Sequence, residues 1–111
     1  MAEAEMSKNL LNNLMKQAQQ MQERVKQLQE EAAGKTVEAS SGGGMVTVVA
    51  NGRQEVLSIK IDPSVVDPAD IEMLQDLISA AVNEALRKAQ EIMKDEMSRL
   101  TAGMGLPPGL I

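Results

Sequence analysis

None of the 111 residues is a Phe, Tyr, Trp, His or Cys. Without His and Cys, the chain lacks the commonest general base, the strongest nucleophile and the usual zinc ligands. Without aromatic side chains it offers no stacking surface, which argues against single-strand nucleic-acid platforms and against haem or flavin pockets. We therefore expect a non-catalytic binding or scaffolding protein with no metal, cofactor or small-molecule substrate. An enzyme limited to carboxylates, Lys and Ser is the less favoured alternative.

The sequence also contains no long apolar run. None approaches the ~20 residues that span a bilayer, so we expect no membrane segment. The first residues, Met1-Ala2-Glu3-Ala4-Glu5, are acidic and lack the basic-then-apolar layout of a secretion signal. The absence of Cys excludes disulfides and is compatible with a reducing compartment. These features predict a cytoplasmic protein with a single domain over residues 1–111.

The apolar content that is present is aliphatic, because the 43% hydrophobic fraction comes from Leu, Val, Ile, Ala and nine Met. Aromatic residues carry the largest buried area per side chain, so a monomer of this composition should have a thin core. Oligomerisation is the simplest way for a small chain to bury more apolar surface. The composition thus favours a homodimer.

The first predicted element is a helix over residues 8–33. Apolar or small side chains recur in it with spacings of 3, 4, 3, 4, 3 and 4, which is an unbroken heptad seam. The seam consists of Leu11, Leu14, Ala18, Met21, Val25, Leu28 and Ala32. Gly34 is a natural stop for the helix. At ~1.5 Å per residue the helix is roughly 39 Å long, so part of it should project or pair with a partner.

Residues 35–61 change to a period of two and predict three antiparallel strands, at about 35–40, 45–50 and 55–61. The Gly-rich residues 40–44 predict the first turn. Asn51-Gly52 predicts a type I′ hairpin turn, which needs a positive φ at both positions. One face of this meander should be buried. Its apolar side chains are candidates for the core or a dimer interface: Val46, Val48, Leu57, Ile59 and Ile61.

A second helix is predicted over residues 69–101, approximately. Asp67 suits its N-cap, Pro68 its first position and Asp70 its third. Gly103 should end it, and the tail at 103–111, which contains Gly and Pro, should be flexible. The order predicts an α+β protein in which a three-stranded antiparallel sheet is flanked by two long projecting helices. The free ends of both helices should lie on the same side, away from the sheet.

The charges are distributed unevenly along the chain. The net charge is −5, but residues 6–22 contain no acid, and the acidic residues gather in the predicted sheet and at the start of the second helix. The exposed positions of residues 6–22 are mainly Asn, Gln and Lys, whose side chains bind phosphates or base edges. The alternative for this stretch is the polar exterior of a coiled helix.

In the second helix, Glu84 with Lys88 and Asp95 with Arg99 have the i, i+4 spacing of intrahelical ion pairs. If both pairs form on a solvated face, Arg87 and Lys94 remain as the freer cations.

Several blocks of the sequence, taken in order, resemble the YbaB/EbfC family of bacterial nucleoid-associated proteins over about residues 8–108. The blocks are Gly42–Val48, Asn51-Gly52, Val56–Pro63, Val66-Asp67-Pro68, Leu74–Lys88 and Gly103–Pro107. The resemblance implies an α–β–β–β–α protomer and a homodimer whose helices project as tweezers and grip double-stranded DNA. It also implies a location at the nucleoid and roles in nucleoid organisation and gene regulation.

The resemblance places the DNA contacts on the projecting helices rather than in a short motif. The implied phosphate contacts are Lys8, Lys16, Arg24, Arg87, Lys94 and Arg99. The implied hydrogen-bonding residues are Asn13, Gln17 and Gln20. Because few cations are involved, we expect binding to be weak and sensitive to salt. The alternative function is a non-catalytic adaptor whose Met-rich helices bind a component of the replication or recombination machinery, which the acidic body favours.

Overall fold

The computed structural model describes residues 2–103, with side chains from residue 7 onward. Its elements are α1 (Ala2–Gly34), β1 (Thr36–Ser41), β2 (Val46–Asn51), β3 (Val56–Ile61), the 3-10 helix η1 (Pro63–Val65) and α2 (Ile71–Gly103). The predicted order of one helix, three strands and a second helix is confirmed. The predicted flexible tail lies, beyond Gly103, outside the described residues.

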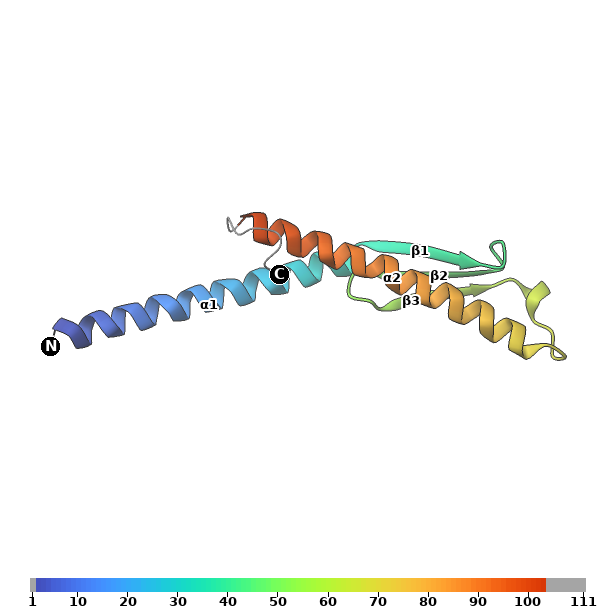
Figure 1. The fold of residues 1–111 in the computed structure, drawn as a ribbon, viewed down its shortest axis with the longest axis horizontal. Helices are drawn as coiled ribbons and strands as arrows, with labels where there is room; N and C mark the ends of the chain where they lie inside the picture. Colours follow the sequence, from blue (N-terminus) through green and yellow to red (C-terminus); the bar gives the residue numbers. More distant parts are fainter. Residues whose placement is uncertain (1, 104–111) are drawn as a thin grey trace.

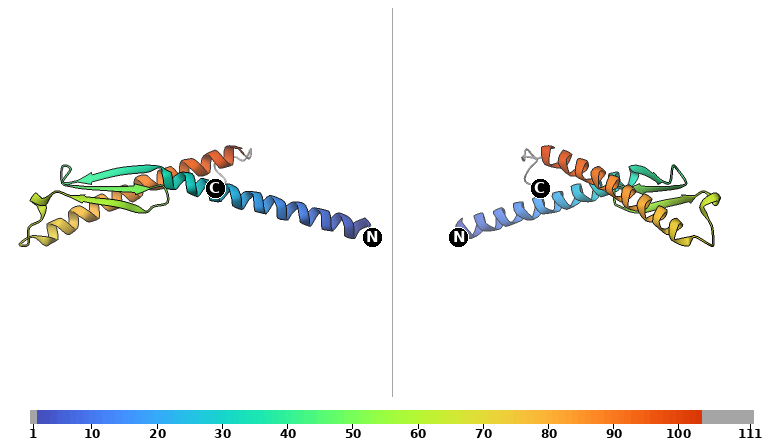
Figure 2. Two further views of the ribbon diagram at one scale, coloured as in Figure 1. Left: turned by 180° about the vertical axis from the view of Figure 1, so that it is seen from behind. Right: turned by 45° about the vertical axis from the view of Figure 1, so that its right-hand side comes forward.

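The molecule is long and narrow, 80 Å by 24 Å by 20 Å. The sheet lies at one end, and α1 runs away from it with most of its length in solvent (Figure 1). The second helix, α2, crosses the sheet and continues past it on the side to which α1 projects (Figures 1 and 2). The beginning of α1 and the end of α2 therefore lie on the same side of the sheet, as predicted.

The core lies between α2 and one face of the sheet, whose strands are antiparallel in the order β1-β2-β3. The sheet contributes small side chains that are fully or almost fully buried: Ala39, Val46, Val48 and Ala50. Helix α2 contributes Ala81, Ala85 and Ala89, all completely buried at a spacing of four residues. Alanine at each contact lets the helix approach the strands closely, but it buries little apolar area. The core is thin, as the composition predicts.

Strand β3 is left largely uncovered, because α2 packs mainly on β1 and β2. Ile59 lies opposite Val48 and Ile61 opposite Val46, so these isoleucines point to the same face as the buried valines. They are nevertheless 44% and 37% exposed, and Leu57 is 54% exposed. Only part of the predicted buried face is therefore buried within one protomer. We refer to Leu57, Ile59 and Ile61 as the β3 face.

The turn between β2 and β3 is not the predicted type I′ hairpin. Among the described residues, the only non-glycine with a positive φ is Gln54, at 60°, and Gly52 is not among the glycines with a positive φ. The chain makes a longer turn, in which the Gln54 N–H donates to the Asn51 carbonyl at 2.9 Å. The Asn51 side-chain oxygen accepts from the N–H groups of Arg53 and Glu55. Asn51 thus organises the turn through its side chain.

Gly52 serves close packing instead. A Cβ at this position would lie 2.6 Å from Ile92 Cγ2 and 2.7 Å from the Ala32 carbonyl oxygen. The Gly52 N–H donates to that oxygen at 2.9 Å and to the Lys35 carbonyl at 3.1 Å. The turn is therefore wedged where the end of α1, the sheet and α2 meet. We call this place, formed by Ala32, Lys35, Gly52, Ile92 and Glu96, the joint.

The start of α2 also differs from the prediction, because the helix begins at Ile71 rather than near residue 69. The Asp67 carboxylate accepts from the Ala69 N–H at 2.9 Å and forms a local turn. Asp70 accepts from the Met73 N–H at 3.2 Å, which is the geometry of an N-cap. Asp70 thus takes the N-cap role predicted for Asp67, because its carboxylate accepts from the N–H of the third residue of the helix.

Candidate nucleic-acid interface

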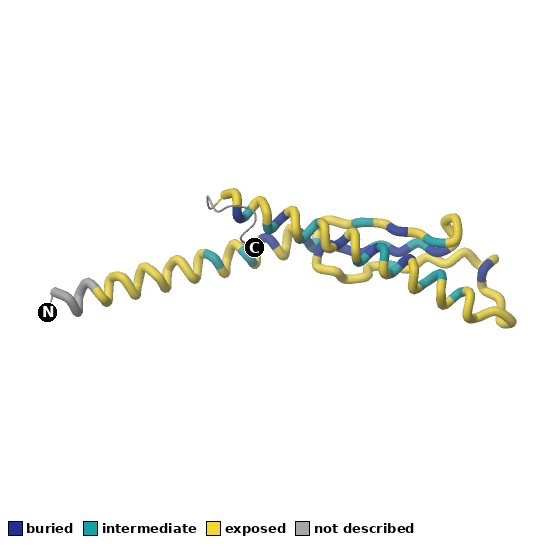
Figure 3. The backbone as a smooth tube through the Cα atoms, in the orientation of Figure 1, coloured by how far each residue is buried: buried dark blue, intermediate teal, exposed yellow. Residues whose placement is uncertain are grey.

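The projecting part of α1 is fully exposed to solvent. Every side chain from residue 7 to residue 20 is exposed, and we call this segment the α1 arm (Figure 3). Burial begins with Met21 and Val25, which are half-buried, and becomes complete at Leu28 and Ala32. Within the described residues, neither α1 nor α2 has a stretch apolar and long enough to cross a membrane.

One face of α1 carries a polar stripe formed by Asn13, Gln17, Gln20 and Arg24. Their spacings of 4, 3 and 4 residues place them above one another on the helix. Lys16 precedes Gln17 and flanks this stripe. Lys8 is exposed as well, but it lies five residues before Asn13, which is not a repeat of a helix face.

The polar stripe ends in a pocket of about 240 Å³ between α1 and α2. Its lining consists of Arg24, Gln27, Leu28, Glu31, Glu96, Arg99 and Leu100. Two residues predicted separately on the two helices, Arg24 and Arg99, are thus brought together in space. Guanidinium groups at this position present donors that suit phosphate oxygens.

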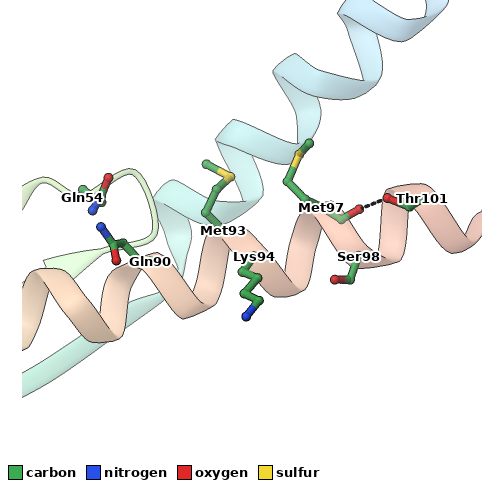
Figure 4. A pocket seen from close by; sticks show the side chains of 7 residues that line it. All are labelled: Gln54, Gln90, Met93, Lys94, Met97, Ser98 and Thr101. Atoms are coloured by element: carbon green, nitrogen blue, oxygen red, sulfur yellow. Dashed lines mark hydrogen bonds between the residues drawn. The ribbon is translucent and has the colours of Figure 1, made fainter. Parts of the chain in front are cut away.

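The cations of α2 do not share one face. Arg99 Nη1 lies 3.5 Å from Glu96 Oε1 in the pocket just described. Lys94 instead lines a second pocket of about 310 Å³, which sequence reasoning did not identify (Figure 4). Four of its α2 residues, Gln90, Lys94, Met97 and Thr101, recur at spacings of 4, 3 and 4, a pattern that marks this face in the sequence.

The second pocket is closed on one side by Gln54, from the turn before β3. Figure 4 shows its carboxamide pointing toward that of Gln90. The remaining lining residues are Met93 and Ser98. Amide and hydroxyl groups donate and accept hydrogen bonds, and the ammonium group donates them, but none of these side chains is a carboxylate for acid–base chemistry or metal binding. Among the described residues, no group of three or more Asp or Glu side chains is placed to hold a metal ion.

The predicted i, i+4 ion pairs of α2 are absent from the described residues. Glu84 is bound by Arg87, three residues on, with Arg87 Nη2 2.6 Å from Glu84 Oε1. This hydrogen bond holds the pKa of Glu84 below its ordinary value. Lys88 reaches the sheet, where its ammonium donates to the Glu38 carbonyl at 2.9 Å. Arg87 is therefore not a free cation, because i, i+3 neighbours are also adjacent on a helix.

Arg99 is likewise bound to Glu96 rather than to Asp95. The Glu96 side chain is only 4% exposed and also forms an ion pair with Lys35, at the end of α1. The hydrogen bond from Lys35 is the main reason why the pKa of Glu96 lies below its ordinary value of 4.5. Glu96 follows Ala89 and Ile92 at spacings of 3 and 4, so it occupies an apolar position of the helix pattern. A charged residue in that position is the sequence signal for this contact.

The free cations nearest the polar stripe are on α1. Among the described residues, Lys16 and Arg24 form no ion pair, in contrast to Arg87 and Arg99. Lys94 also forms none within the described part of the chain. A polyanion can engage Lys16 and Arg24 without first displacing a carboxylate, which removes one cost of binding.

The chain matches the model of the YbaB/EbfC DNA-binding family over residues 6–104. It is 62% identical over 100 residues to a nucleoid-associated protein of Acetivibrio thermocellus, and the aligned region covers 90% of this chain and 88% of that protein. It is 58% identical over 97 residues to a nucleoid-associated protein of Thermoanaerobacter pseudethanolicus, covering 87% of each.

A likeness also exists among solved structures. A crystal structure of an uncharacterized protein from Helicobacter pylori superposes with a TM-score of 0.60 and 31% sequence identity, over 70% of this chain and 90% of that one. The family match extends over both helices and the whole sheet, and therefore includes the polar stripe and the joint. The chain belongs to the YbaB/EbfC DNA-binding family.

Proposed function

We propose that this protein is a homodimer that grips double-stranded DNA with its projecting helices and takes part in nucleoid organisation and gene regulation. The family is a DNA-binding one, and the relatives described above are named nucleoid-associated proteins. These names support a location at the nucleoid in the bacterial cytoplasm. DNA and a second copy of the chain are the partners in this proposal, without a membrane or a small-molecule substrate.

The observation that carries the proposal is the α1 arm. A helix that projects from a small domain is available to enter the major groove, which is ~12 Å wide and admits an α-helix. The stretch from residue 6 to residue 22 has no acid, although the whole chain has a net charge of −5. The α1 arm lies entirely within this acid-free stretch, so its cations have no acidic neighbour on the arm itself.

The proposed contacts fall into two groups. Lys16 and the polar stripe form the main surface, with Arg24 and Arg99 meeting at its inner end. The outer group consists of Lys8, Arg87 and Lys94. Arg87 and Arg99 would each have to exchange a glutamate for a phosphate, but Arg99 shares its pocket with Arg24, and Lys94 lies on another face of α2 than Arg99. We therefore expect the outer group to contribute less affinity.

The β3 face is the proposed two-fold interface. A three-stranded sheet with one uncovered strand leaves apolar side chains in water next to a thin core. An interface between identical subunits uses the same patch on both, so the β3 faces of two copies can cover one another. The two copies would then present two α1 arms to one duplex.

DNA binding can be tested by titrating the purified protein with a duplex of about three helical turns (~30 base pairs). Binding is followed by fluorescence anisotropy at a series of salt concentrations. The logarithm of the binding constant should fall linearly with the logarithm of the salt concentration, by about 0.9 per phosphate contact. Because a dimer carries each substitution twice, Lys16→Glu or Arg24→Glu should reduce that slope by about 1.8 and weaken binding.

Lys60→Glu is the matched control, since it makes the same charge change on β3, in the sheet rather than on the α1 arm. It should bind DNA with the salt slope of the unmodified protein. Equal losses for Lys16→Glu and Lys60→Glu would show that only net charge matters and would contradict a grip by the α1 arm. If the unmodified protein does not bind at low salt, the adaptor function is favoured, which the exposed leucines of the α1 arm would then serve.

A further inference from the structure

The α1 arm has an apolar side that contact with DNA does not explain. Leu10, Leu11, Leu14 and Met15 are 53–61% exposed. They lie in the stretch of α1 whose described side chains are all exposed (Figure 3). Phosphates and base edges are bound by polar groups, so large aliphatic side chains add little to a grip on the DNA backbone. A projecting helix with no packed face is also only marginally stable in water.

Leu11 and Leu14 belong to a longer heptad seam, whose other end is buried within the protomer. From Leu28 the seam continues through Val25 and Met21 to Ala18, Leu14 and Leu11, with alternating spacings of three and four residues. Leu28 is buried, whereas the last three positions are exposed. A repeat of 3.5 residues is the pattern that fits a second helix with the same repeat by knobs-into-holes packing.

The charges beside the seam indicate which helix that is. Beside Leu11, Leu14 and Ala18 the positions that flank the seam are Leu10, Met15 and Gln17, none of which is charged, whereas Lys8 is a flanking cation nearer the free end of α1. Two identical helices can therefore meet along Leu11, Leu14 and Ala18 without repulsion between like charges. Helix α2 does not offer a matching seam, because its exposed large apolar side chains among the described residues are Ile71 and Met73, in its first turn.

We propose that the seams of two α1 arms, from two copies of this chain, pair as a two-helix coiled coil. This contact goes beyond the two-fold contact proposed at the β3 face, and it links one dimer to the next. Lys16 lies two residues from both Leu14 and Ala18, on the opposite side of the helix, and stays open to DNA. An assembly joined in this way can hold more than one duplex segment.

Sedimentation velocity of the DNA-free protein over a concentration series tests the pairing. For the unmodified protein we expect species of at least twice the dimer mass, growing with concentration. Leu11→Gln with Leu14→Gln should abolish these species and leave the dimer, because Gln keeps the helix propensity but removes the apolar knobs. The matched control, Asn9→Gln with Asn12→Gln, changes the same helix away from the seam and should assemble like the unmodified protein.

A second variant separates packing from a loss of folding. Leu11→Met with Leu14→Met keeps the seam apolar and should retain the assembly. A wild-type protein that stays a dimer at every concentration would overturn the proposal. The seam would then be a binding site for a different protein. Assembly of the double Gln variant at the wild-type concentration would overturn it equally. No DNA is present in these sedimentation experiments, so they test the pairing of the α1 arms independently of DNA binding. DNA binding is tested by the titration described above.

Discussion

At the scale of single residues, Gly52 decides whether the joint can close. The methyl group of Gly52→Ala would lie 2.6 Å from Ile92 Cγ2 and 2.7 Å from the Ala32 carbonyl, closer than atoms in contact can be. Overpacking of this kind typically costs ~1–3 kcal/mol, so we expect Gly52→Ala to lower the free energy of unfolding by this amount. The measurement is urea unfolding followed by circular dichroism.

Gly34→Ala is the control for this prediction, since no atom lies within 4 Å of a Cβ at Gly34 and the substitution is the same. Its effect should remain within about 0.5 kcal/mol, as for surface substitutions elsewhere. Equal destabilisation by both variants would mean that backbone freedom matters at Gly52 rather than space.

The stability of the joint should depend on pH through the carboxylate of Glu96. Its pKa is lowered in the folded protein by Lys35, so the carboxylate stabilises the fold above its ordinary pKa of 4.5. This contribution is lost as the pH falls through the lowered folded value, because the unfolded state then binds the proton more readily. We expect Glu96→Gln to be less stable than the unmodified protein at neutral pH and the difference to shrink toward pH 3, as measured by thermal unfolding.

Asp95→Asn makes the same kind of change at the neighbouring position. Asp95 is exposed and forms no ion pair within the described residues. At neutral pH this variant should therefore lose less stability than Glu96→Gln. An unchanged difference for Glu96→Gln would show that the Lys35 contact does not carry the effect.

At the scale of elements, local patterns predicted the order and approximate bounds of the helices and strands. The 3–4 spacing of Leu11 through Ala32 and the alternation in β1 and β2 depend only on neighbours in the sequence. The type I′ turn was wrong because Gly52 is held by contacts with Ala32 and Ile92, which are distant in sequence. The joint could not be derived from local patterns, since it forms only when three elements meet.

The contact between α2 and the sheet depends on small side chains, which gives a prediction at this scale. Ala85 is completely buried against the sheet, so Ala85→Leu adds three carbon atoms where there is no space. We expect a loss of ~1–3 kcal/mol from overpacking, or a displacement of α2 that relieves it. Urea unfolding gives the first result, and a changed amide spectrum of β1 and β2 indicates the second.

Ala80→Leu is the matched control on the same helix, because Ala80 is exposed. Ala80→Leu changes the helix propensity by the same small amount as Ala85→Leu, so it should leave the free energy of unfolding nearly unaltered. A comparable loss in both variants would place the cost in the helix itself rather than in its contact with the sheet.

At the scale of the whole molecule, the projection of both helices to one side follows from the order of the elements. Because three antiparallel strands end at the edge opposite to the one where α1 enters, α2 begins at that far edge, runs back across the sheet and extends past the edge from which α1 projects (Figure 1). Which cations meet could not be foreseen in this way. Arg24 and Arg99 line one pocket whereas Lys94 lies in another, and this depends on the rotation of each helix about its own axis.

The same scale contains the strongest prediction about function, which concerns the β3 face. Ile59 is 44% exposed, so Ile59→Glu can be accommodated in a single protomer, but it places two carboxylates against each other in the proposed two-fold interface. We expect a monomer by sedimentation, and a large loss of DNA affinity because a monomer offers one α1 arm instead of two linked ones.

Lys60→Glu, on the opposite face of the same strand, should remain a dimer and bind normally. If Ile59→Glu stays dimeric, the two-fold contact lies elsewhere. If it becomes a monomer that binds DNA as tightly as before, one α1 arm is sufficient and the grip by two arms is wrong.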